Sequence, residues 1–385
     1  MSGAARSRRR AGADEARDES HLRVTLALAR RGALTASPNP QVGALVVRGG
    51  RVIGAGFHRG PGSDHAEVRA LRQAGDGARG ATLYVNLEPC SHHGRTPPCV
   101  DAIRAAAIRR VVACHVDPNP RVRGRGFARL RQAGIEVSFG LLETEARALN
   151  ETYLRFIVSR RPFVVMKAGM SLDGRIAVAS GASRWITSAA SRRAAGRLRR
   201  GCDAVLVGVG TVIADDPTLS AAVRGREKRG FLRVVLDSRL RIPAGARLLR
   251  AARLRGVRIY TTRAAPAARA RRLERAGATV VRVGSRAGRV DPRAVVADLG
   301  RLEVASLLVE GGGEVHASFL AAGLVDKVAL FIAPRLLGGR DAVPVVGGRG
   351  AADPAAGFRL RLRGAERVGP DLLWIGTPVR GRGER

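Results

Sequence analysis

The hydrophobic positions along the chain follow two spacings in alternation. Segments with apolar residues three or four positions apart, as in a helix, alternate with short apolar runs typical of buried strands. Gly49-Gly50 lies between two such runs and predicts a β-hairpin. This alternation predicts an α/β layered fold. In the first half we expect helices over 21–31, 66–74, 100–107 and 125–133, and strands over 42–47, 51–56, 83–87 and 111–116.

A second series of elements follows a long predicted helix over 144–159. Arg160-Arg161-Pro162 ends that helix, because proline disfavours helical backbone in the residue before it. We therefore expect one domain over 20–148, a connecting helix or linker over 149–161, a second domain over 162–379, and disordered tails at 1–19 and 380–385. The strands expected in the second domain cover 163–166, 204–207, 234–236, 257–261, 279–283, 307–310 and 328–333.

Composition supports two ordinary globular domains. The chain has 385 residues, 45% of them hydrophobic, which is enough for sizeable cores. No apolar run approaches the roughly 18 residues of a membrane-spanning helix, and the N-terminal residues lack the apolar core of a secretory signal. Four cysteines are too few for a disulfide scaffold. We expect a reduced, cytoplasmic protein.

The formal net charge of +36 comes almost wholly from arginine. Among 68 basic residues, only Lys167, Lys228 and Lys327 are lysines. The arginines are scattered and aromatic residues make up 4% of the chain, whereas a nucleic-acid surface shows a local basic stripe with stacking aromatics. The charge is compatible with a solvated surface rich in arginine or with attraction to a polyanion. We favour the first and expect no nucleic-acid or membrane partner.

One constellation in the first half carries recognisable chemistry. His65-Ala66-Glu67 is followed by Pro89-Cys90 and then by Cys99. One imidazole and two thiolates form a zinc ligand set that leaves a fourth position open, as in catalytic sites. Zinc in such a site makes water acidic, and Glu67 can move protons between that water and a nucleobase ring. We predict one zinc ion on His65, Cys90 and Cys99, with Glu67 as the catalytic acid and base.

The spacing of the two cysteines leaves an alternative open. Eight residues separate them, whereas the general nucleobase-deaminase motif has two. Cys99 can still reach the site if it begins the helix over 100–107. A closed structural zinc site with His92 or His93 as fourth ligand, or two unrelated buried cysteines, would also fit, but Glu67 would have no purpose there. Residues without ligand spacing are expected in the core: His58, Cys114, His115, Cys202 and His316.

Five motifs in order identify a family for the first half. They are Ser37-Pro38-Asn39-Pro40-Gln41-Val42-Gly43, His65-Ala66-Glu67, Glu88-Pro89-Cys90-Ser91-His92, Thr96-Pro97-Pro98-Cys99 and Asp117-Pro118-Asn119-Pro120. Together they resemble the deaminase half of the bifunctional deaminase/reductase of riboflavin biosynthesis, in which a long loop between the cysteines is typical. The resemblance implies a cytidine-deaminase-like three-layer α/β/α domain acting on a diaminopyrimidinone with a phosphoribosylamino group. It places Asn39 in the pyrimidine pocket and leaves His92, His93 and Arg95 as candidates for the ribose phosphate.

Two glycine-rich turns follow expected strands in the second half. One lies in Val205–Thr211, and the other lies in Leu308–Glu314 before a helical stretch over 315–322. Glycine lets backbone N–H groups approach a pyrophosphate, although tight turns also use it for steric reasons. Neither turn is a G-x-G-x-x-G followed by an acidic residue about 20 positions on, so a Rossmann fold is not supported.

Further motifs resemble the reductase half of the same family, so that the resemblance spans about residues 20–378. They are Lys167–Arg175, Ser183–Thr187, Gly210–Pro217, Leu236–Ser238 and Glu310–Ser318. The resemblance implies a dihydrofolate-reductase-like α/β domain that uses NADPH to reduce the ribose of the deaminated product to ribitol. The chain departs from the family pattern at Ala182 and Gly196, and in the spacing between Leu219 and Arg224.

The resemblance also assigns residues to the reductase site. Cofactor contacts fall on Gly169, Trp185, Thr211, Asp215, Ser238, Gly312, Gly313, Glu314, Val315, His316, Ala317 and Ser318. Substrate contacts fall on Lys167, Ser183, Arg199, Leu219, Arg224 and Glu310. These residue types suit their roles, because arginine can clamp a phosphate with two hydrogen bonds and tryptophan offers a flat face to a nicotinamide. We expect a small-molecule substrate and a homo-oligomer.

Overall fold

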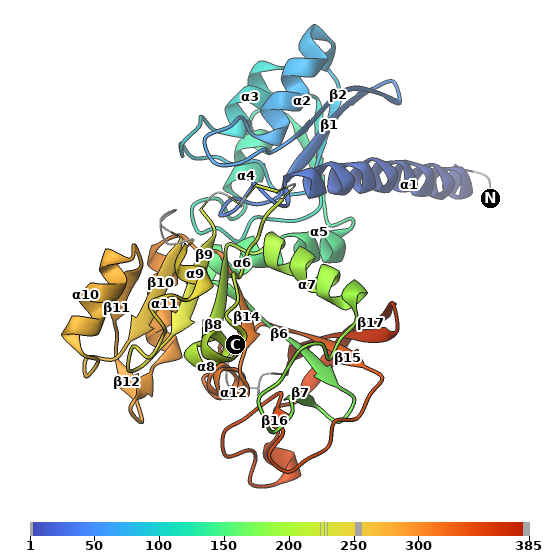
Figure 1. Ribbon diagram of the computed structural model, residues 1–385. Coiled ribbons are helices and arrows are strands. Elements are labelled where there is room, and N and C mark those ends of the chain that lie inside the picture. The colour runs from blue at the N-terminus through green and yellow to red at the C-terminus, as the bar shows by residue number, and fades with distance from the viewer. Residues whose placement is uncertain (1–2, 224, 227, 229, 251–255, 380–385) are drawn as a thin grey trace. The chain divides into compact units, whose positions relative to one another are not determined.

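The structure, a computed structural model, describes residues 3–223, 225–226, 228, 230–250 and 256–379, with side chains from Asp14 onward. The chain divides into two compact units, Met1–Ser159 and Arg160–Arg385. Each unit has its own sheet and its own apolar cores, as Figure 1 shows.

The first unit is built on a five-stranded sheet in the order β2-β1-β3-β4-β5. The β1–β2 hairpin predicted at Gly49-Gly50 is confirmed, and both glycines have positive φ (55° and 77°) in its turn. β1 also pairs antiparallel with β3, whereas β3, β4 and β5 are parallel. The strands are β1 (Gly43–Arg48), β2 (Arg51–Phe57), β3 (Thr82–Val85), β4 (Arg110–Ala113) and β5 (Glu136–Phe139).

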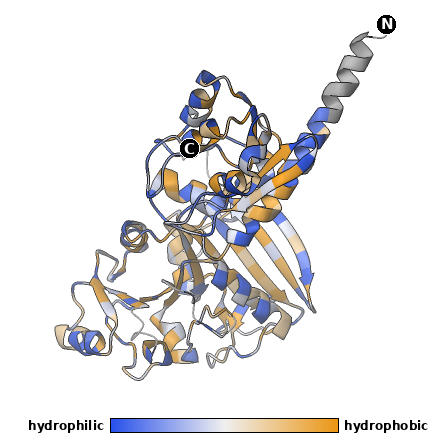
Figure 2. Ribbon diagram, turned by 90° about the horizontal axis from the view of Figure 1, so that it is seen from above, coloured by the Kyte–Doolittle hydropathy of each residue, from blue (hydrophilic) through white to orange (hydrophobic). Residues whose placement is uncertain are grey.

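Helices cover both faces of this sheet, which confirms the three-layer α/β/α arrangement. On one face α2 (Ala66–Ala74), α3 (Cys99–Ala105) and α4 (Arg125–Gln132) pack with the sheet in a large apolar core. On the other face, residues of α1 (Gly3–Ala29) and α5 (Glu143–Leu149) form a second core with the sheet. Figure 2 shows that hydrophobic and hydrophilic residues are mixed along the helices and strands. The remaining elements are η1 (Arg30–Gly32), η2 (Gly75–Ala78) and α6 (Glu151–Ser159).

The prediction of a disordered tail through residue 19 is wrong, because α1 already begins at Gly3. Asp18 is buried against the sheet and accepts a hydrogen bond from the Tyr84 hydroxyl at 2.7 Å. Arg110 donates two further hydrogen bonds to the same carboxylate, at 3.0 and 2.8 Å. Both partners lie far along the chain, so the local run of small and charged residues gave no sign of them.

The single helix predicted over 144–159 is two helices that meet at Asn150. The Asn150 side chain accepts a hydrogen bond from the Gln41 backbone N–H at 2.8 Å and donates one to the Gln41 carbonyl at 3.0 Å. This pairing ties the break to the loop before β1. Helical spacing alone could not show it, because the partner lies 109 positions earlier.

The second unit contains a nine-stranded sheet in the order β11-β10-β9-β8-β14-β6-β15-β18-β17. Its strands from β11 to β15 are parallel, and β15, β18 and β17 pair antiparallel. The predicted strands are all present as β6 (Phe163–Ser171), β8 (Ala204–Gly208), β9 (Leu232–Leu236), β10 (Val257–Thr261), β11 (Thr279–Arg282), β14 (Ser306–Gly311) and β15 (Lys327–Ala333). Shorter strands outside this sheet are β7 (Arg175–Ala177), β12 (Ser285–Arg286), β13 (Arg289–Val290) and β16 (Val343–Pro344).

The hairpin of β17 (Leu360–Val368) and β18 (Asp371–Pro378) was not among the predicted elements. Alternating apolar residues on either side of Gly369-Pro370 were the available signal. α11 (Pro292–Arg301) and α12 (Gly313–Ala321) contribute to the core on one face of the large sheet. α7 (Ala189–Gly201), α8 (Val209–Asp215), α9 (Arg247–Arg250) and α10 (Ala267–Arg275) contribute to cores on the other. η4 (Pro354–Ala356) completes the unit.

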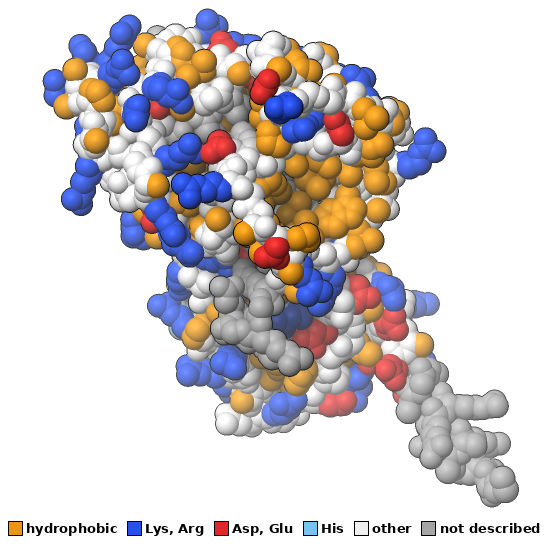
Figure 3. Space-filling model, turned by 90° about the horizontal axis from the view of Figure 1, so that it is seen from below, with side chains coloured by type: hydrophobic (Ala, Val, Ile, Leu, Met, Phe, Trp, Pro, Cys, Tyr) orange, Lys and Arg blue, Asp and Glu red, His pale blue; other side chains and the backbone are white. Residues whose placement is uncertain are grey.

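The surface shows how the large positive charge is distributed. On the face drawn in Figure 3, Lys and Arg side chains are spread widely, and hydrophobic side chains gather in a separate area. None of the helices in the described part of the chain is both long enough and apolar enough to cross a membrane.

Replacing Asp18 with Asn tests whether α1 depends on its buried ion pair. Asp18→Asn keeps the size of the side chain but leaves the half-buried Arg110 guanidinium without this carboxylate. We expect the free energy of local opening of residues 14–29 to fall by about 2 kcal/mol, as for a lost hydrogen bond to a charged group. Amide hydrogen exchange measures this change.

Asp14→Asn is the matched control on the same helix. Asp14 and its partner Arg17 are mostly exposed, with side chains 59% and 62% accessible, so their ion pair contributes little. Equal exchange rates of residues 14–29 in wild type and Asp18→Asn would contradict the role assigned to Asp18.

Candidate active sites

Three segments of the first unit bring His65, Cys90 and Cys99 together. His65 is the residue before α2, in an extended conformation (φ −68°, ψ 161°), Cys90 lies in the loop after β3, and Cys99 begins α3. The His65 Nδ1 atom lies 3.0 Å from Cys99 Sγ and 3.5 Å from Cys90 Sγ. All three ligand atoms lie within 4.8 Å of one another. Cys99 thus returns to the site at the start of a helix, as expected.

The chemistry of this cluster fits zinc. Hydrogen bonding to Cys99 and to His65 outweighs the effect of burial and lowers the pKa of Cys90 to about 4, so the site stabilises a thiolate. Within the described residues, no fourth His, Cys, Asp or Glu joins the cluster. His92 and His93 therefore give no support to a closed site, and a coordination position is left for a water molecule.

Glu67 lies in the first turn of α2, two residues beyond His65, and is 4% exposed. Burial raises the pKa of its carboxyl group, and the neighbouring His65 opposes this effect. Interaction with the Cys99 side chain also opposes this rise in pKa. The structure therefore brings the predicted acid–base group and the predicted metal ligands into one site.

Asn39 and His58 extend this site on the side of His65. The Asn39 Nδ2 atom lies 3.0 Å from His58 Nε2, and the His58 ring packs edge-on against His65 with 5.3 Å between ring centroids. Burial lowers the pKa of His58, which favours a neutral ring. From the sequence, we expected His58 in the core without a role. It is buried, but its contacts connect Asn39 to His65.

The buried carboxylate of Glu88 holds the surroundings of Cys90. It accepts hydrogen bonds from the backbone N–H groups of Asp117, Gly124, Gly126 and Phe127, at 2.8 to 3.3 Å. The Tyr153 hydroxyl in turn donates to the Asp117 carboxylate, and its oxygen lies 3.1 and 2.9 Å from the two carboxylate oxygens. The segment 117–127 is thereby joined to the loop that contains Cys90. Glu88 belongs to one of the family motifs, but its place in the sequence predicted no role for it.

The predicted reductase residues meet mainly at the carboxyl ends of parallel strands, where open α/β sheets bind ligands. Arg199 of α7 forms a two-bond ion pair with the Glu310 carboxylate, at 2.7 and 2.6 Å, and also donates to the Ser220 carbonyl. Burial opposes ionisation of Glu310, but Lys167 and Arg199 outweigh it and lower its pKa. Lys167, Arg199 and Glu310 therefore form one charged group.

A second set of predicted site residues lies in the turns after β8 and β14. Ser183 donates a hydrogen bond to Asp215 at 2.8 Å. A Cβ added to Gly311 would lie 2.8 Å from the Thr211 hydroxyl, and one added to Gly313 would lie 2.4 Å from the Pro344 carbonyl. Gly312 has a φ of 80°, which favours glycine. Glycine is therefore required at these turns, because neighbouring atoms lie too close to the backbone for a Cβ atom to fit.

The remaining predicted contacts have diverse surroundings. Trp185 is 61% exposed, with the Arg192 guanidinium 4.3 Å from its ring, and Thr187 lies against Gly169. The Leu219 side chain is buried, so only its backbone can face a ligand. Arg224 lies outside the described residues. Of the departures from the family pattern, Gly196 lies within α7 and Ala182 is exposed.

The turn and first helix after β14 are only partly open to a ligand. Val315 and His316 have buried side chains, and the His316 ring bonds to the Val345 carbonyl at 2.7 Å. Ser318 donates to the Val315 carbonyl, while Ala317 is half-buried. Gly313 is also buried, so Gly312 and Glu314 are the residues of this segment best placed for a cofactor.

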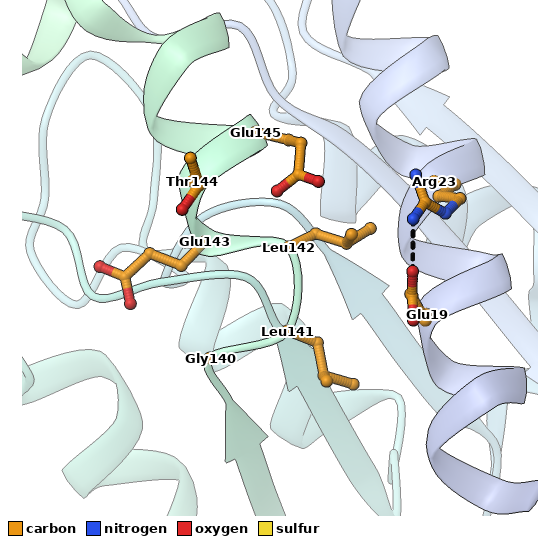
Figure 4. A pocket seen from close by; sticks show the side chains of 8 residues that line it. All are labelled: Glu19, Arg23, Gly140, Leu141, Leu142, Glu143, Thr144 and Glu145. Atoms are coloured by element: carbon orange, nitrogen blue, oxygen red, sulfur yellow. Dashed lines mark hydrogen bonds and ion pairs between the residues drawn. The ribbon is translucent and has the colours of Figure 1, made fainter.

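A separate pocket of the first unit contains none of the predicted site residues. It lies between α1 and the segment after β5, and Glu143 and Glu145 border it (Figure 4). In Figure 4 its Arg23 is paired with Glu19 of the same helix. Its other lining residues are Gly140, Leu141, Leu142 and Thr144.

Two protein families match this chain, one over each unit. The family described as the cytidine and deoxycytidylate deaminase zinc-binding region matches residues 15–115. The RibD C-terminal domain matches residues 162–374, more than half of the chain. These matches support the expected deaminase-like and reductase-like α/β domains, a zinc ion in the first and NADPH as cofactor of the second.

Individual relatives match almost the whole chain. The riboflavin biosynthesis protein RibD of Escherichia coli (strain K12) is 41% identical over 369 residues, covering 92% of this chain and 98% of the relative. That of Aquifex aeolicus (strain VF5) is 40% identical over 356 residues, covering 92% and 97%.

Two solved structures have the same fold over the same length. Acinetobacter baumannii RibD (form 1) superposes with a TM-score of 0.85 at 34% identity, covering 95% of this chain and 100% of that one. The Thermotoga maritima diaminohydroxyphosphoribosylaminopyrimidine deaminase/5-amino-6-(5-phosphoribosylamino)uracil reductase has a TM-score of 0.82 at 33% identity, with the same coverage. The chain therefore belongs to the RibD family, the bifunctional deaminase/reductases of riboflavin biosynthesis.

Proposed function

We propose that Glu67 is the catalytic acid and base of the first domain, and that His65, Cys90 and Cys99 hold its zinc ion. The substrate is the diaminopyrimidinone that carries a phosphoribosylamino group. The observation that carries this proposal is the meeting of one imidazole and two thiols beside a buried carboxyl group. When bound, zinc supplies Lewis acidity to the attacking water.

Glu67 and its neighbours account for the proton transfers of hydrolytic deamination. Glu67 takes a proton from the attacking water as the new C–O bond forms at the amino-bearing ring carbon. It gives protons to the ring nitrogen and to the leaving amine, so that the C–N bond breaks and ammonia departs. Asn39, held by His58, is placed to hydrogen-bond the pyrimidine. His92, His93 and Arg95 remain candidates for the ribose phosphate.

In the second domain we propose that the ends of β8, β9 and β14 hold NADPH. The cofactor residues are those assigned from the family resemblance, with Gly312 offering its backbone N–H group just before α12. Lys167, Ser183, Arg199, Leu219, Arg224 and Glu310 contact the phosphoribosyl substrate. Bound NADPH supplies the hydride, so these residues need only bind and orient the ribose.

We propose that Arg199 acts mainly by positioning Glu310. Three of its donor groups are already used, two on Glu310 and one on the Ser220 carbonyl. The two-bond pairing holds a buried carboxylate in one orientation next to Lys167. This arrangement suits the recognition of sugar hydroxyl groups by Glu310 and Lys167.

We propose further that the chain self-associates through the β15–β18–β17 end of its sheet. Leu330 and Ile332 pair with Trp374 and Leu372, so these four side chains share one face. Leu362 lies on the same face and is 55% exposed. α7 packs on the opposite face, against residues such as Leu373. Burial in a homo-oligomer would remove this apolar surface from water.

A cytoplasmic location and the absence of a nucleic-acid partner complete the proposal. All four cysteines are among the described residues, and none forms a disulfide. Two of them must stay reduced as thiolates to hold zinc. The spread of basic side chains in Figure 3 favours a solvated arginine-rich surface over a nucleic-acid stripe.

Glu67→Gln separates proton transfer from metal binding. The variant should retain one zinc per chain, because its ligands are unchanged, and should lose ammonia release by about 100-fold or more, since the amide cannot exchange the proton. Zinc analysis and an ammonia assay measure the two properties. Substantial remaining deamination with zinc in place would remove Glu67 from its catalytic role.

Arg199→Ala tests the positioning of Glu310. Loss of hydrogen bonds to a charged group should raise the reductase KM for substrate about 10- to 100-fold, and Arg199→Lys, which cannot bond with the same two-pronged geometry, should recover only part of it. Arg197→Ala, an exposed change on the same helix, is the control. Deaminase kinetics should stay unchanged in all three variants. Unaltered reductase kinetics in Arg199→Ala would contradict the assignment.

Leu362→Glu tests the apolar sheet face. A charge at this exposed position cannot be buried in an interface, so the variant should have a lower molar mass than wild type in light scattering. Val158→Glu is the control, because Val158 is 62% exposed on α6 of the first unit. A monomeric wild type, or equal masses for wild type and Leu362→Glu, would contradict this interface.

A further inference from the structure

A two-stranded hairpin in the second unit carries a pair of arginines on one face. β12 and β13 are joined through Ala287 and Gly288, which both have positive φ (50° and 72°). Arg286 and Arg289 are directly opposite each other in the hairpin register. Side chains of directly opposite residues lie close together on the same face, and like charges there repel.

The hairpin is anchored beside two of the strand ends proposed to hold the cofactor. The Val290 backbone N–H donates to the Ser238 hydroxyl at 3.0 Å, and Ser238 lies two residues beyond β9. The Arg289 guanidinium bonds to the Glu314 carboxylate in the first turn of α12, which follows β14. In the sheet, β8 lies between β9 and β14. The hairpin therefore connects the two sides of the proposed cofactor site.

Packing on the other side of the hairpin holds it in this place. Val290 is buried in the apolar core under α11. The next residue, Asp291, caps α11 by accepting a hydrogen bond from the Arg293 N–H at 2.9 Å. The Asp291 N–H also bonds to the Gly284 carbonyl and closes the hairpin. The two arginines are thus presented by a backbone that is fixed at its base.

The ion pair between Arg289 and Glu314 does not neutralise the two positive charges of Arg286 and Arg289. Arg289 and Glu314 have side chains 69% and 57% exposed, so their attraction is weak and easily replaced. The Glu314 carboxylate is already shared, because it also accepts a hydrogen bond from the Gly348 N–H at 2.9 Å. The part of the chain that the structure describes provides no carboxylate partner for Arg286. Two guanidinium groups beside one shared carboxylate form a place for an added anion.

We propose that Arg286 and Arg289, together with Ser238, bind the 2′-phosphate of NADPH and thereby select NADPH over NADH. This inference rests on the proposed placement of the cofactor along β9, β8 and β14. A phosphate monoester carries close to two negative charges at neutral pH, and arginine binds it through two parallel hydrogen bonds. Arg289 exchanges Glu314 for this stronger acceptor. NADH has a hydroxyl group in place of the phosphate and gains nothing from the exchange.

Adenosine 2′,5′-bisphosphate and 5′-AMP test this site directly, because they differ only in the 2′-phosphate. Calorimetry at fixed ionic strength compares wild type with Arg289→Ala and with the double variant Arg286→Ala/Arg289→Ala. We expect wild type to prefer the bisphosphate by about 10- to 100-fold, the range for hydrogen bonds to a charged group. The preference should shrink in Arg289→Ala and vanish in the double variant, while 5′-AMP binding stays the same.

The double variant Arg271→Ala/Arg275→Ala is the matched control. It removes the same charge from exposed positions on α10 and should keep the preference. The ratio of kcat/KM for NADPH to that for NADH should fall in parallel with the binding preference, and deaminase activity should not change. Both target arginines are exposed, so the variants are expected to fold.

Three results would overturn the proposal. One is an unchanged preference for the bisphosphate in the double variant. Another is an equal loss of 5′-AMP and bisphosphate binding, which would mean that the arginines act on another phosphate of the cofactor. A third is a loss of ribose 5-phosphate binding instead, which would assign them to the substrate. By contrast, a wild type that neither binds nor oxidises NADPH would refute the proposed reductase function itself.

Discussion

The buried carboxylate of Glu88 is the constraint on which the deaminase site depends. Cys90 lies two residues away in a loop without regular structure, so its position needs a fixed neighbour. Four backbone N–H groups of residues 117–127 converge on Glu88, and a charged acceptor makes each of these hydrogen bonds strong. The Cys90 loop and the 117–127 segment are thereby held as one structure, and His65, Cys90 and Cys99 are already close together in it.

Arginine has two different uses in this chain. Many arginines are exposed and account for the large net charge. On the face drawn in Figure 3, basic side chains are spread widely. A few form specific two-bond contacts with carboxylates, as Arg110 does with Asp18 and Arg199 with Glu310. The second group holds α1 on its sheet and orients a buried carboxylate near Lys167. The number of arginines thus indicates little about function, whereas the carboxylates that bind Arg110 and Arg199 show what these two residues hold in place.

The second domain builds its site by a common rule of parallel sheets. Turns after β8, β9 and β14 open at the same edge, because parallel strands have their carboxyl ends together. Glycine at Gly311 and Gly313 permits the close packing seen there. Polar groups from separate segments, such as Ser183 with Asp215 and Ser238 with the hairpin, then surround that edge. The proposed site of this domain therefore depends on contacts between separate segments more than on any single sequence motif.

The sequence by itself predicted the cluster of His65, Cys90, Cys99 and Glu67, the two-domain order and most strands, because each depends on local residue types and spacing. It failed where long-range partners decide the outcome. Asp18 makes the expected tail a helix through Tyr84 and Arg110, and Asn150 divides a helix through Gln41. The pairing of Arg199 with Glu310 and the closeness of Asn39, His58 and His65 likewise follow only from folding. Local patterns record what a segment can form, whereas tertiary contacts between distant residues select which form is stable.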